Sequence, residues 1–416
     1  MIREQLILNR TATTAMSIED YCFNASQRQI FEEIVGLLDS NINTPKIVFV
    51  DGPGGTGKTY LFNSLLNHVR SDEANGGICL AVASSGTAAL LLKGGTTAHS
   101  RFNIPLEVDS NTTCGISPRS DLGDLIRMTK LIVWDEASMI SKDIFEAIDR
   151  TFRDVCKLDN PALEDVPFGG KIVVFGGDLR QVLPVINKAS RTDIVNQCIN
   201  RSPLWRHVVK LQLQVNMRVL QATGTEAAIL DSFSKYLLRI GNGSEPTIEG
   251  TEFDIALDNN MLISNKNPIN TFLNTVYQDF QGQSFDQDRE AFLTSKAILT
   301  PKNTDVNTIN DYLINKFPGE VVSIYSADKL DTQDKDEQVQ YPVEYLNSIN
   351  VGGLPPHDLK LKKGCPIMLL RNINPSKGLC NGTRLICVDI QTRTIVTRIV
   401  TGKLLNFFSE VTNSWF

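Results

Sequence analysis

The 416-residue sequence has no closely spaced pair of cysteines and only four histidines. Its eight cysteines are scattered along the chain, without a C-x-x-C arrangement. Because structural zinc sites use such pairs, this pattern argues against structural zinc. Scattered free thiols fit a reducing compartment, such as the cytosol, the nucleus or the mitochondrial matrix.

Long apolar runs and a strong charge of one sign are missing as well. No run approaches the roughly 20 apolar residues of a membrane helix, so we expect no membrane among its partners. The N-terminal residues lack the long apolar region of a secretory signal. The formal net charge of −6 argues weakly against a protein that coats nucleic acid through bulk charge. Local basic contacts to DNA are compatible with this charge.

Short apolar runs alternate with helical patterns through the first half of the chain. Such alternation predicts buried strands of a parallel sheet that helices cover on both faces. Right-handed crossovers then give a doubly wound α/β domain, with its ligand site at the carboxyl ends of the strands. The predicted strands are KIVFV (46–50), ICLAVA (78–83), LIVWDE (131–136) and KIVVFGG (171–177), and helices are expected at 86–93 and 141–154.

The alternation begins again after residue 210 and changes to short β runs from about residue 345. Close-spaced strands without helices suggest a small barrel-like insertion. The later helices are expected at 224–240, 267–279 and 305–317, with a strand at KAILT (296–300). We divide the chain into an N-terminal tail (1–20), a RecA-like P-loop NTPase domain (21–210), an incomplete second domain of this kind (211–345) and a small β-rich module (346–416).

The run GPGGTGKT (52–59) carries the strongest chemical signal. It follows a predicted strand and opens a predicted helix, where glycines let backbone N–H groups surround phosphate oxygens. In such loops Lys58 reaches the β- and γ-phosphates, and the Thr59 hydroxyl ligates Mg²⁺. The alternative is a glycine-rich structural turn. The predicted phosphate-binding residues are Gly52, Pro53, Gly54, Gly55, Thr56, Gly57, Lys58 and Thr59.

Two further strand ends place polar groups beside this loop. In LIVWDE, Asp135 would hold Mg²⁺, and Glu136 would orient and deprotonate the attacking water. In KIVVFGGDLRQVLPV, Gln181 can hydrogen-bond both the γ-phosphate and that water. Without the loop, each would be an ordinary solvated strand end.

Seven segments occur in the order of superfamily-one helicase motifs. The chain resembles the PIF-type DNA helicases, especially the branch associated with helitron transposons, over about residues 20 to 390. Seven motifs in register are far more specific than any one of them. The segments are FNASQ (23–27), GPGGTGKT (52–59), ASSGTAALLL (83–92), TTAHSRF (96–102), DEASM (135–139), GGDLRQVLPV (176–185) and LQVNMR (213–218).

The resemblance assigns roles to further residues. Gln27 matches the glutamine that reads adenine, which implies ATP. Arg218 matches an arginine that reaches across an interdomain cleft to the γ-phosphate; without the resemblance it would be a solvated strand end. His99 and Phe102 match a motif that lines the DNA path, where an aromatic side chain can stack on a base; the alternative for Phe102 is a core position. The small hydroxyls at a predicted helix start suit a DNA phosphate: Ser84, Ser85 and Thr87.

The resemblance implies an ATP-dependent DNA helicase that moves 5′ to 3′ on single-stranded DNA or DNA junctions. It also implies roles in DNA repair, recombination and telomere maintenance, a nuclear or alternatively mitochondrial location, and an SH3-like fold for the C-terminal module. Two later motifs of the family, one with a second arginine finger, do not occur. We therefore expect a chain truncated at its C-terminus, and a weakly active ATP- and DNA-binding protein without productive unwinding is the alternative. An unrelated P-loop enzyme such as a kinase is a third reading, which the run from Ala83 to Phe102 disfavours.

Overall fold

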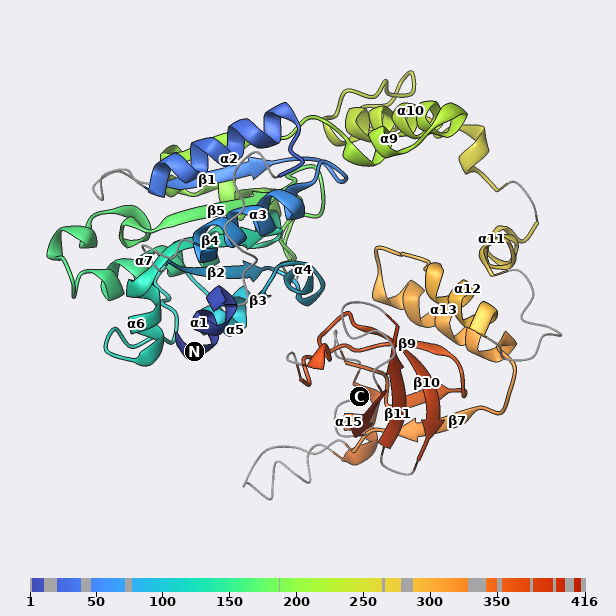
Figure 1. Cartoon of the computed structure of the whole chain (residues 1–416). Helices are drawn as coiled ribbons and strands as arrows, with labels where there is room; N and C mark the ends of the chain where they lie inside the picture. The colour runs from blue at the N-terminus through green and yellow to red at the C-terminus, as the bar shows by residue number, and fades with distance from the viewer. Residues whose placement is uncertain are drawn as a thin grey trace. The chain divides into compact units, whose positions relative to one another are not determined.

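A computed structural model describes most of the chain, which forms two compact units, Met1–Ile255 and Ala256–Phe416 (Figure 1). Each unit has its own buried apolar clusters. The described residues are 2–10, 21–38, 46–71, 77–186, 188–263, 266–277, 287–327, 342–349, 354–374, 377–391, 394–400 and 408–412.

The first unit is built on a parallel sheet of six strands in the order β3-β2-β4-β5-β1-β6. Its central strands are buried along nearly their whole length, as the apolar runs predict. The strands are β1 (Ile47–Asp51), β2 (Ile78–Ala83), β3 (Thr96–Thr97), β4 (Thr129–Asp135), β5 (Ile172–Gly177) and β6 (Val208–Gln212).

Helices connect these strands. Part of the expected N-terminal tail forms helix α1, which packs against α3 and β2. Residues 11–20 of the tail lie outside the described ranges. The helices of this unit are α1 (Ile2–Arg10), α2 (Ala25–Leu38), α3 (Lys58–Ser71), α4 (Gly86–Leu91), α5 (Ala98–Phe102), α6 (Asp121–Met128), α7 (Lys142–Cys156), α8 (Arg191–Asn196), α9 (Met217–Gln221) and α10 (Gly224–Gly241).

The sheet separates two apolar cores. Alternate residues of one strand enter opposite cores: Phe49 of β1 lies in one, and its neighbour Val48 lies in the other. Helices α5, α6 and α7 supply side chains to the first core, and α2 and α3 supply side chains to the second. This arrangement holds the carboxyl ends of β1, β4 and β5 at one edge of the unit.

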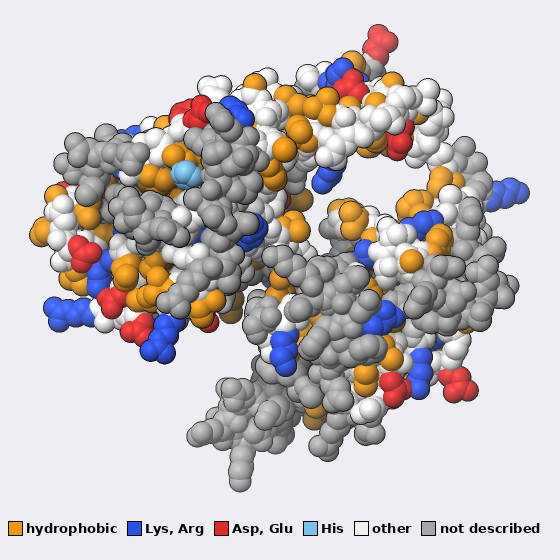
Figure 2. Space-filling view, in the orientation of Figure 1, with side chains coloured by type: hydrophobic (Ala, Val, Ile, Leu, Met, Phe, Trp, Pro, Cys, Tyr) orange, Lys and Arg blue, Asp and Glu red, His pale blue; other side chains and the backbone are white. Residues whose placement is uncertain are grey.

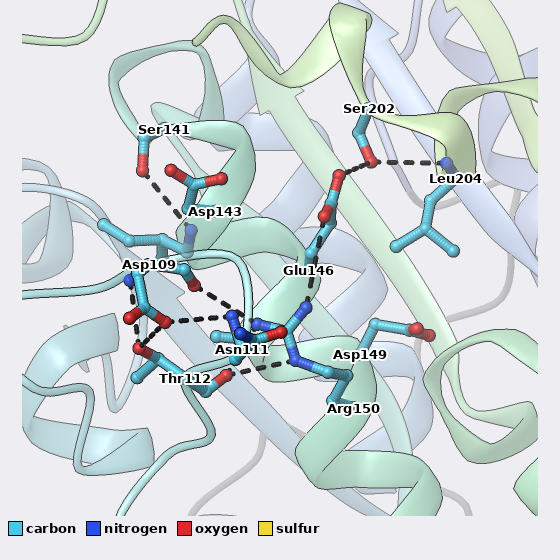
Figure 3. A network of polar contacts seen from close by, with 12 residues as sticks. Asp109, Asn111, Thr112, Ser141, Asp143, Glu146, Asp149, Arg150, Ser202 and Leu204 are labelled. Atoms are coloured by element: carbon cyan, nitrogen blue, oxygen red, sulfur yellow. Dashed lines mark hydrogen bonds and ion pairs between the residues drawn. The ribbon is translucent and has the colours of Figure 1, made fainter.

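Helix α7 also fastens two surface segments to the first unit (Figure 3). The Arg150 guanidinium donates to the Thr112 carbonyl through Nη2 at 2.6 Å and Nε at 3.1 Å. One turn earlier, Glu146 accepts a 2.7 Å hydrogen bond from the Ser202 hydroxyl. The loop that follows α5 and the segment that leads into β6 are therefore tied to one helix.

The second unit carries two antiparallel sheets among its described residues. One pairs β7 (Val322–Tyr325) with β8 (Asp358–Leu361), and the other has the order β12-β11-β10-β9. The remaining elements are α11 (Pro268–Val276), α12 (Gln287–Ser295), α13 (Asn303–Lys316), α15 (Val343–Ser348), β9 (Pro366–Met368), β10 (Arg384–Ile390), β11 (Thr394–Ile399) and β12 (Phe408–Thr412).

Two expectations for the region after residue 210 differ from the structure. The run KAILT (296–300) is not a strand, since it has no strand partner among the described residues and Leu299 is 92% exposed. The helix expected at 224–240 in the second domain, α10, falls in the first unit, together with α9, where no helix was expected. Two side-chain hydrogen bonds hold α10 there, from Asn216 to Ser234 and from Arg180 to Asn242.

Candidate functional site

The loop between β1 and α3 packs closely against side-chain amides from two other segments. Gly55 and Gly57 have φ values of +89° and +81°, which glycine adopts readily and other residues rarely do. A Cβ on Gly55 would lie 2.6 Å from Oδ1 of Asn216, and one on Gly57 would lie 2.5 Å from Nε2 of Gln27. Larger residues at either position would therefore displace a neighbouring amide.

Lys58 begins helix α3, and its ammonium group turns back over the loop. Nζ donates to the Gly52 carbonyl and, at 3.4 Å, to the Pro53 carbonyl. The Thr56 hydroxyl donates to the same Pro53 carbonyl at 2.9 Å. The loop thus holds a positive charge beside a helix N-terminus, an arrangement that favours a phosphate group.

A pocket of about 670 Å³ opens over this loop. That volume suits a drug-sized or nucleotide-sized ligand. The pocket brings together twelve of the residues that the sequence predicts for nucleotide chemistry: Gln27, Pro53, Gly54, Gly55, Thr56, Gly57, Lys58, Thr59, Asp135, Glu136, Gln181 and Arg218. Gly52 is not among the residues that line the pocket. Its N–H donates to the Gly177 carbonyl at the end of β5, at 3.3 Å.

Gln27 is buried, with 1% of its surface exposed, and its amide is oriented from both ends. Nε2 donates to the Thr56 carbonyl at 3.0 Å, and Oε1 accepts from the Asn24 N–H at 3.1 Å. The Gln27 side chain therefore connects the start of α2 to the loop between β1 and α3.

Two carboxylates stand at the end of β4. Burial raises the pKa of Asp135, against the opposing effects of the Glu136 N–H and of Lys58. Burial, and then the neighbouring Asp135 charge, raise the pKa of Glu136. Glu136 also has a left-handed backbone, with φ 54° and ψ 36°, which is uncommon for a residue with a side chain and frequent at functional sites. A carboxylate with a raised pKa is a stronger base.

The end of β5 supplies Gln181 and a buried acidic partner. Nε2 of Gln181 donates to Oδ2 of Asp178 at 3.2 Å, and its backbone N–H donates to the Asp178 carbonyl at 3.1 Å. The Asp178 carboxylate also accepts from the Arg180 side chain at 2.9 Å. Gln181 is therefore held at the pocket wall by Asp178.

Arg218 lies on α9, in the same unit as the loop. The Met217 N–H donates to the Gly55 carbonyl at 2.9 Å, and a Cβ on Gly55 would lie 3.3 Å from Cγ and Cδ of Arg218. The arginine therefore reaches the pocket from a segment bonded directly to the loop. Its approach is local within the first unit, whereas the sequence resemblance implies one across an interdomain cleft.

The hydroxyl groups expected at a DNA phosphate gather where β2 meets α4. The Ser84 hydroxyl accepts from Trp134 Nε1 at 3.0 Å, and the Ser85 hydroxyl caps α4 by accepting from the Ala88 N–H at 3.2 Å. Thr87 is exposed beside them, 3.2 Å from Ser85 between hydroxyl oxygens. His99 is half-buried in α5, and burial lowers its pKa, which favours the neutral imidazole. Basic side chains on the face drawn in Figure 2 are scattered among acidic and apolar ones.

Phe102 does not line a DNA path, because it is 0% exposed. Its ring packs in the first core, 5.9 Å from the ring centroid of Trp134 and 5.3 Å from that of Phe152. The prediction that it stacks on a base is therefore wrong, and the core alternative is correct. An aromatic residue next to polar ones at the end of a short helix can face either way.

The buried position of Phe102 predicts a large effect on stability. Phe102→Ala should lower the free energy of unfolding by about 3–5 kcal/mol, measured by urea denaturation, because it leaves a cavity in the core. Phe102→Leu should retain most of the stability and bind single-stranded DNA as tightly as the parent. A stable Phe102→Leu variant that lost about 1–3 kcal/mol of DNA affinity would indicate stacking instead.

Sequence analysis missed pocket residues that are next in sequence to the predicted ones. Tyr60 follows the loop and accepts a 3.1 Å hydrogen bond from the Cys22 N–H, and Met217 accepts one from Asn24 Nδ2 at 3.2 Å. Both line the pocket. Their adjacency to Thr59 and Arg218 was the available signal.

Comparison with known families covers most of the chain. Residues 22–251 match the PIF1-like helicase family, and residues 344–390 match the DNA helicase Pif1, 2B domain. This chain belongs to the PIF1-like helicase family. The loop, the strand ends and α9 all lie within the first match, and the second match includes β8, β9 and β10.

The relatives of this PIF1-like chain are longer than it is. The ATP-dependent DNA helicase PIF1 of Xenopus laevis is 24% identical over 83% of this chain and 44% of its own length. The human protein of the same name is 24% identical over 88% of this chain and 47% of its own length. The chain spans about half the length of the curated relatives that it matches.

Solved structures agree on the fold. Bacteroides Pif1 bound to ssDNA has 22% sequence identity and a TM-score of 0.59, over 94% of this chain and 74% of that one. The Pif1 helicase from Candida albicans has 17% identity and a TM-score of 0.56, over 94% and 78%. At such identities the likeness concerns the fold alone.

The residues of this PIF1-like pocket fit a nucleotide with a magnesium ion. A glycine loop with a lysine suits the phosphates, and a hydroxyl with a carboxylate suits Mg²⁺, which commonly takes one or two protein ligands beside substrate phosphates. Elsewhere in the described ranges there is no group of three or more His, Cys, Asp or Glu that could hold a metal. No described helix is both long enough and apolar enough to cross a bilayer.

Proposed function

We propose that this chain is the ATP-hydrolysing motor of a DNA helicase, which moves on single-stranded DNA with 5′-to-3′ polarity. The observation that carries the proposal is the single pocket shared by Lys58, Glu136 and Arg218. Membership of the PIF1-like family supports it. The polarity rests on the resemblance of the sequence motifs.

Each pocket residue has a task in this proposal. The loop N–H groups and Lys58 bind the phosphates. A bound Mg²⁺ would neutralise phosphate charge, with Thr59 and Asp135 as the residues that hold it. Glu136 orients the attacking water and accepts its proton at the carboxylate, and its raised pKa suits that role. Arg218 offsets the negative charge that develops on the transferred phosphoryl group.

Two amide side chains add selectivity and sensing. An amide has two N–H donors and two acceptor lone pairs, so the two hydrogen bonds of Gln27 leave capacity for an adenine base. Gln181, which lines the pocket and is held by Asp178, would contact both the γ-phosphate and the water. ATP is therefore the nucleotide that we propose.

The proposed DNA partner is single-stranded DNA or a DNA junction. Ser84, Ser85 and Thr87 at the start of α4 offer hydroxyl groups to a phosphate, and His99 lies nearby in α5 as a neutral hydrogen-bonding group. Of the neighbours, Bacteroides Pif1 was solved with single-stranded DNA. Roles in repair, recombination and telomere maintenance, and a nuclear or mitochondrial location, are proposed from the family resemblance.

ATP hydrolysis measured with and without single-stranded DNA tests this function. We expect the rate to rise severalfold when oligo-dT is added, because a translocating motor couples the two ligands. DNA affinity should fall with salt, with a log–log slope of roughly −0.7 for each phosphate contact. Double-stranded DNA without a single-stranded end serves as the control.

The possible results of this assay distinguish the proposed DNA motor from two alternative functions. ATP turnover that ignores single-stranded DNA would refute a DNA motor and favour an unrelated P-loop enzyme. Stimulated turnover without strand separation of a forked duplex would favour the binding protein that does not unwind.

A further inference from the structure

Arg180 joins two neighbouring strand ends with a fork of hydrogen bonds. Nη1 donates to Asp51 Oδ1 at 3.1 Å and to Asp178 Oδ1 at 2.9 Å, and Nη2 donates to Asp51 Oδ2 at 3.1 Å. Asp51 ends β1 and leads directly into the phosphate loop, and Asp178 directly follows β5. One guanidinium thus bridges two carboxylates at the edge of the pocket, a geometry that lysine cannot reproduce.

The same side chain holds the end of α10. Nε of Arg180 donates to Oδ1 of Asn242, the C-cap of that helix, at 2.9 Å. Gly241 lets the helix approach closely, since a Cβ there would lie 3.0 Å from Cβ of Arg180. The helix end therefore rests on the stem of the arginine.

These contacts connect Arg180 to Gln181 and to the segment that carries Arg218. Asp178 holds the Gln181 amide at 3.2 Å, so the position of Arg180 sets that of Gln181. Helix α10 also accepts a 3.0 Å hydrogen bond at Ser234 from Asn216, which caps the helix that carries Arg218. A shift at one end of α10 would therefore reach the Arg218 segment.

We propose that Arg180 is a positioning residue for ATP hydrolysis, which fixes Gln181 and the end of α10 relative to the phosphate loop. The inference rests on the proposed ATPase function. Arg180 itself is absent from the residues that line the pocket. Its loss should therefore lower turnover far more than nucleotide binding. Misplacement of catalytic groups by about 1 Å can cost on the order of 100-fold in rate.

The test compares kcat for ATP with the Kd for a fluorescent ATP analogue in three full-length variants. Arg180→Ala should lower kcat about 10- to 100-fold and change Kd by less than about threefold. Arg180→Lys should recover part of the loss, because it restores one charge without the fork. Asn242→Ala keeps the fork, removes only the acceptor on α10, and should lower kcat severalfold. Because Asn242→Ala leaves the Arg180 fork intact, this variant tests the proposal even if Arg180→Ala does not fold.

Arg153→Ala is the matched control. Arg153 pairs with Asp149 at 2.8 Å on α7, and the side-chain exposures of that pair, 25% and 6%, equal those of Arg180 and Asp178. The Arg153→Ala variant should hydrolyse ATP with the kcat of the parent. Equal kcat losses in Arg153→Ala and Arg180→Ala, a Kd that rises as much as kcat falls, or parent-like kcat in all Arg180 and Asn242 variants would each overturn the proposal. A parent chain without ATP turnover would instead refute the proposed function.

Discussion

Lys58→Ala should reduce ATP hydrolysis by about 100- to 1000-fold, the scale on which one pre-positioned charge stabilises a transition state. The ammonium lies over the loop, and its hydrogen bonds among the described residues go to the carbonyls of Gly52 and Pro53. Its loss removes charge from the phosphate site and no core packing. The midpoint of thermal unfolding should stay close to that of the parent, and a coupled phosphate-release assay measures the rate.

Lys142→Ala is the control for this substitution. Lys142 is also the first residue of a long helix of the same unit, and it is half-buried as Lys58 is. It should hydrolyse ATP at the rate of the parent. A Lys58→Ala rate within about twofold of the parent would remove the basis for the loop assignment.

Glu136→Gln should slow hydrolysis by roughly 100-fold or more while Mg-ATP still binds, because the amide keeps the shape of the side chain and cannot accept the proton. Burial and Asp135 both raise the pKa of Glu136, so the native carboxylate is a stronger base than an exposed one. Single-turnover hydrolysis and equilibrium binding of a fluorescent ATP analogue separate the two effects.

Asp135→Asn is the companion variant. It should raise the Mg²⁺ concentration that half-maximal hydrolysis requires, whereas Glu136→Gln should leave that concentration unchanged. If Glu136→Gln lost nucleotide binding together with turnover, Glu136 would be a metal ligand and the division of tasks between the two carboxylates would be wrong.

Sequence patterns predicted four of the six strands of the first unit, with ends within one or two residues of those observed. The run ICLAVA coincides with β2, and KIVVFGG begins one residue before β5. Strands buried on both faces appear in the sequence as continuous apolar runs, and their carboxyl ends meet at one edge. For this reason Lys58, Asp135 and Gln181 could be placed together before any contact was known.

Side-chain direction and long-range pairing could not be read in this way. Phe102 faces the core because α5 packs beside Trp134 and Phe152, which a local motif does not encode. The Arg180 side chain donates a hydrogen bond to Asp51, which lies 129 residues earlier in the sequence. The apolar run KAILT has strand composition but no partner strand among the described residues, and strand formation depends on such pairing.

The strand order has a consequence for synthesis on the ribosome. β1, which leads into the phosphate loop, pairs only with β5 and β6 among the described strands, and Ile47 meets Val173 and Val208. Chains grow at about 5–20 residues per second. The nascent β1 therefore waits on the order of ten seconds for both neighbouring strands and for the backbone hydrogen bonds that they supply. During this interval the segment is a natural target for chaperones that bind extended apolar peptides.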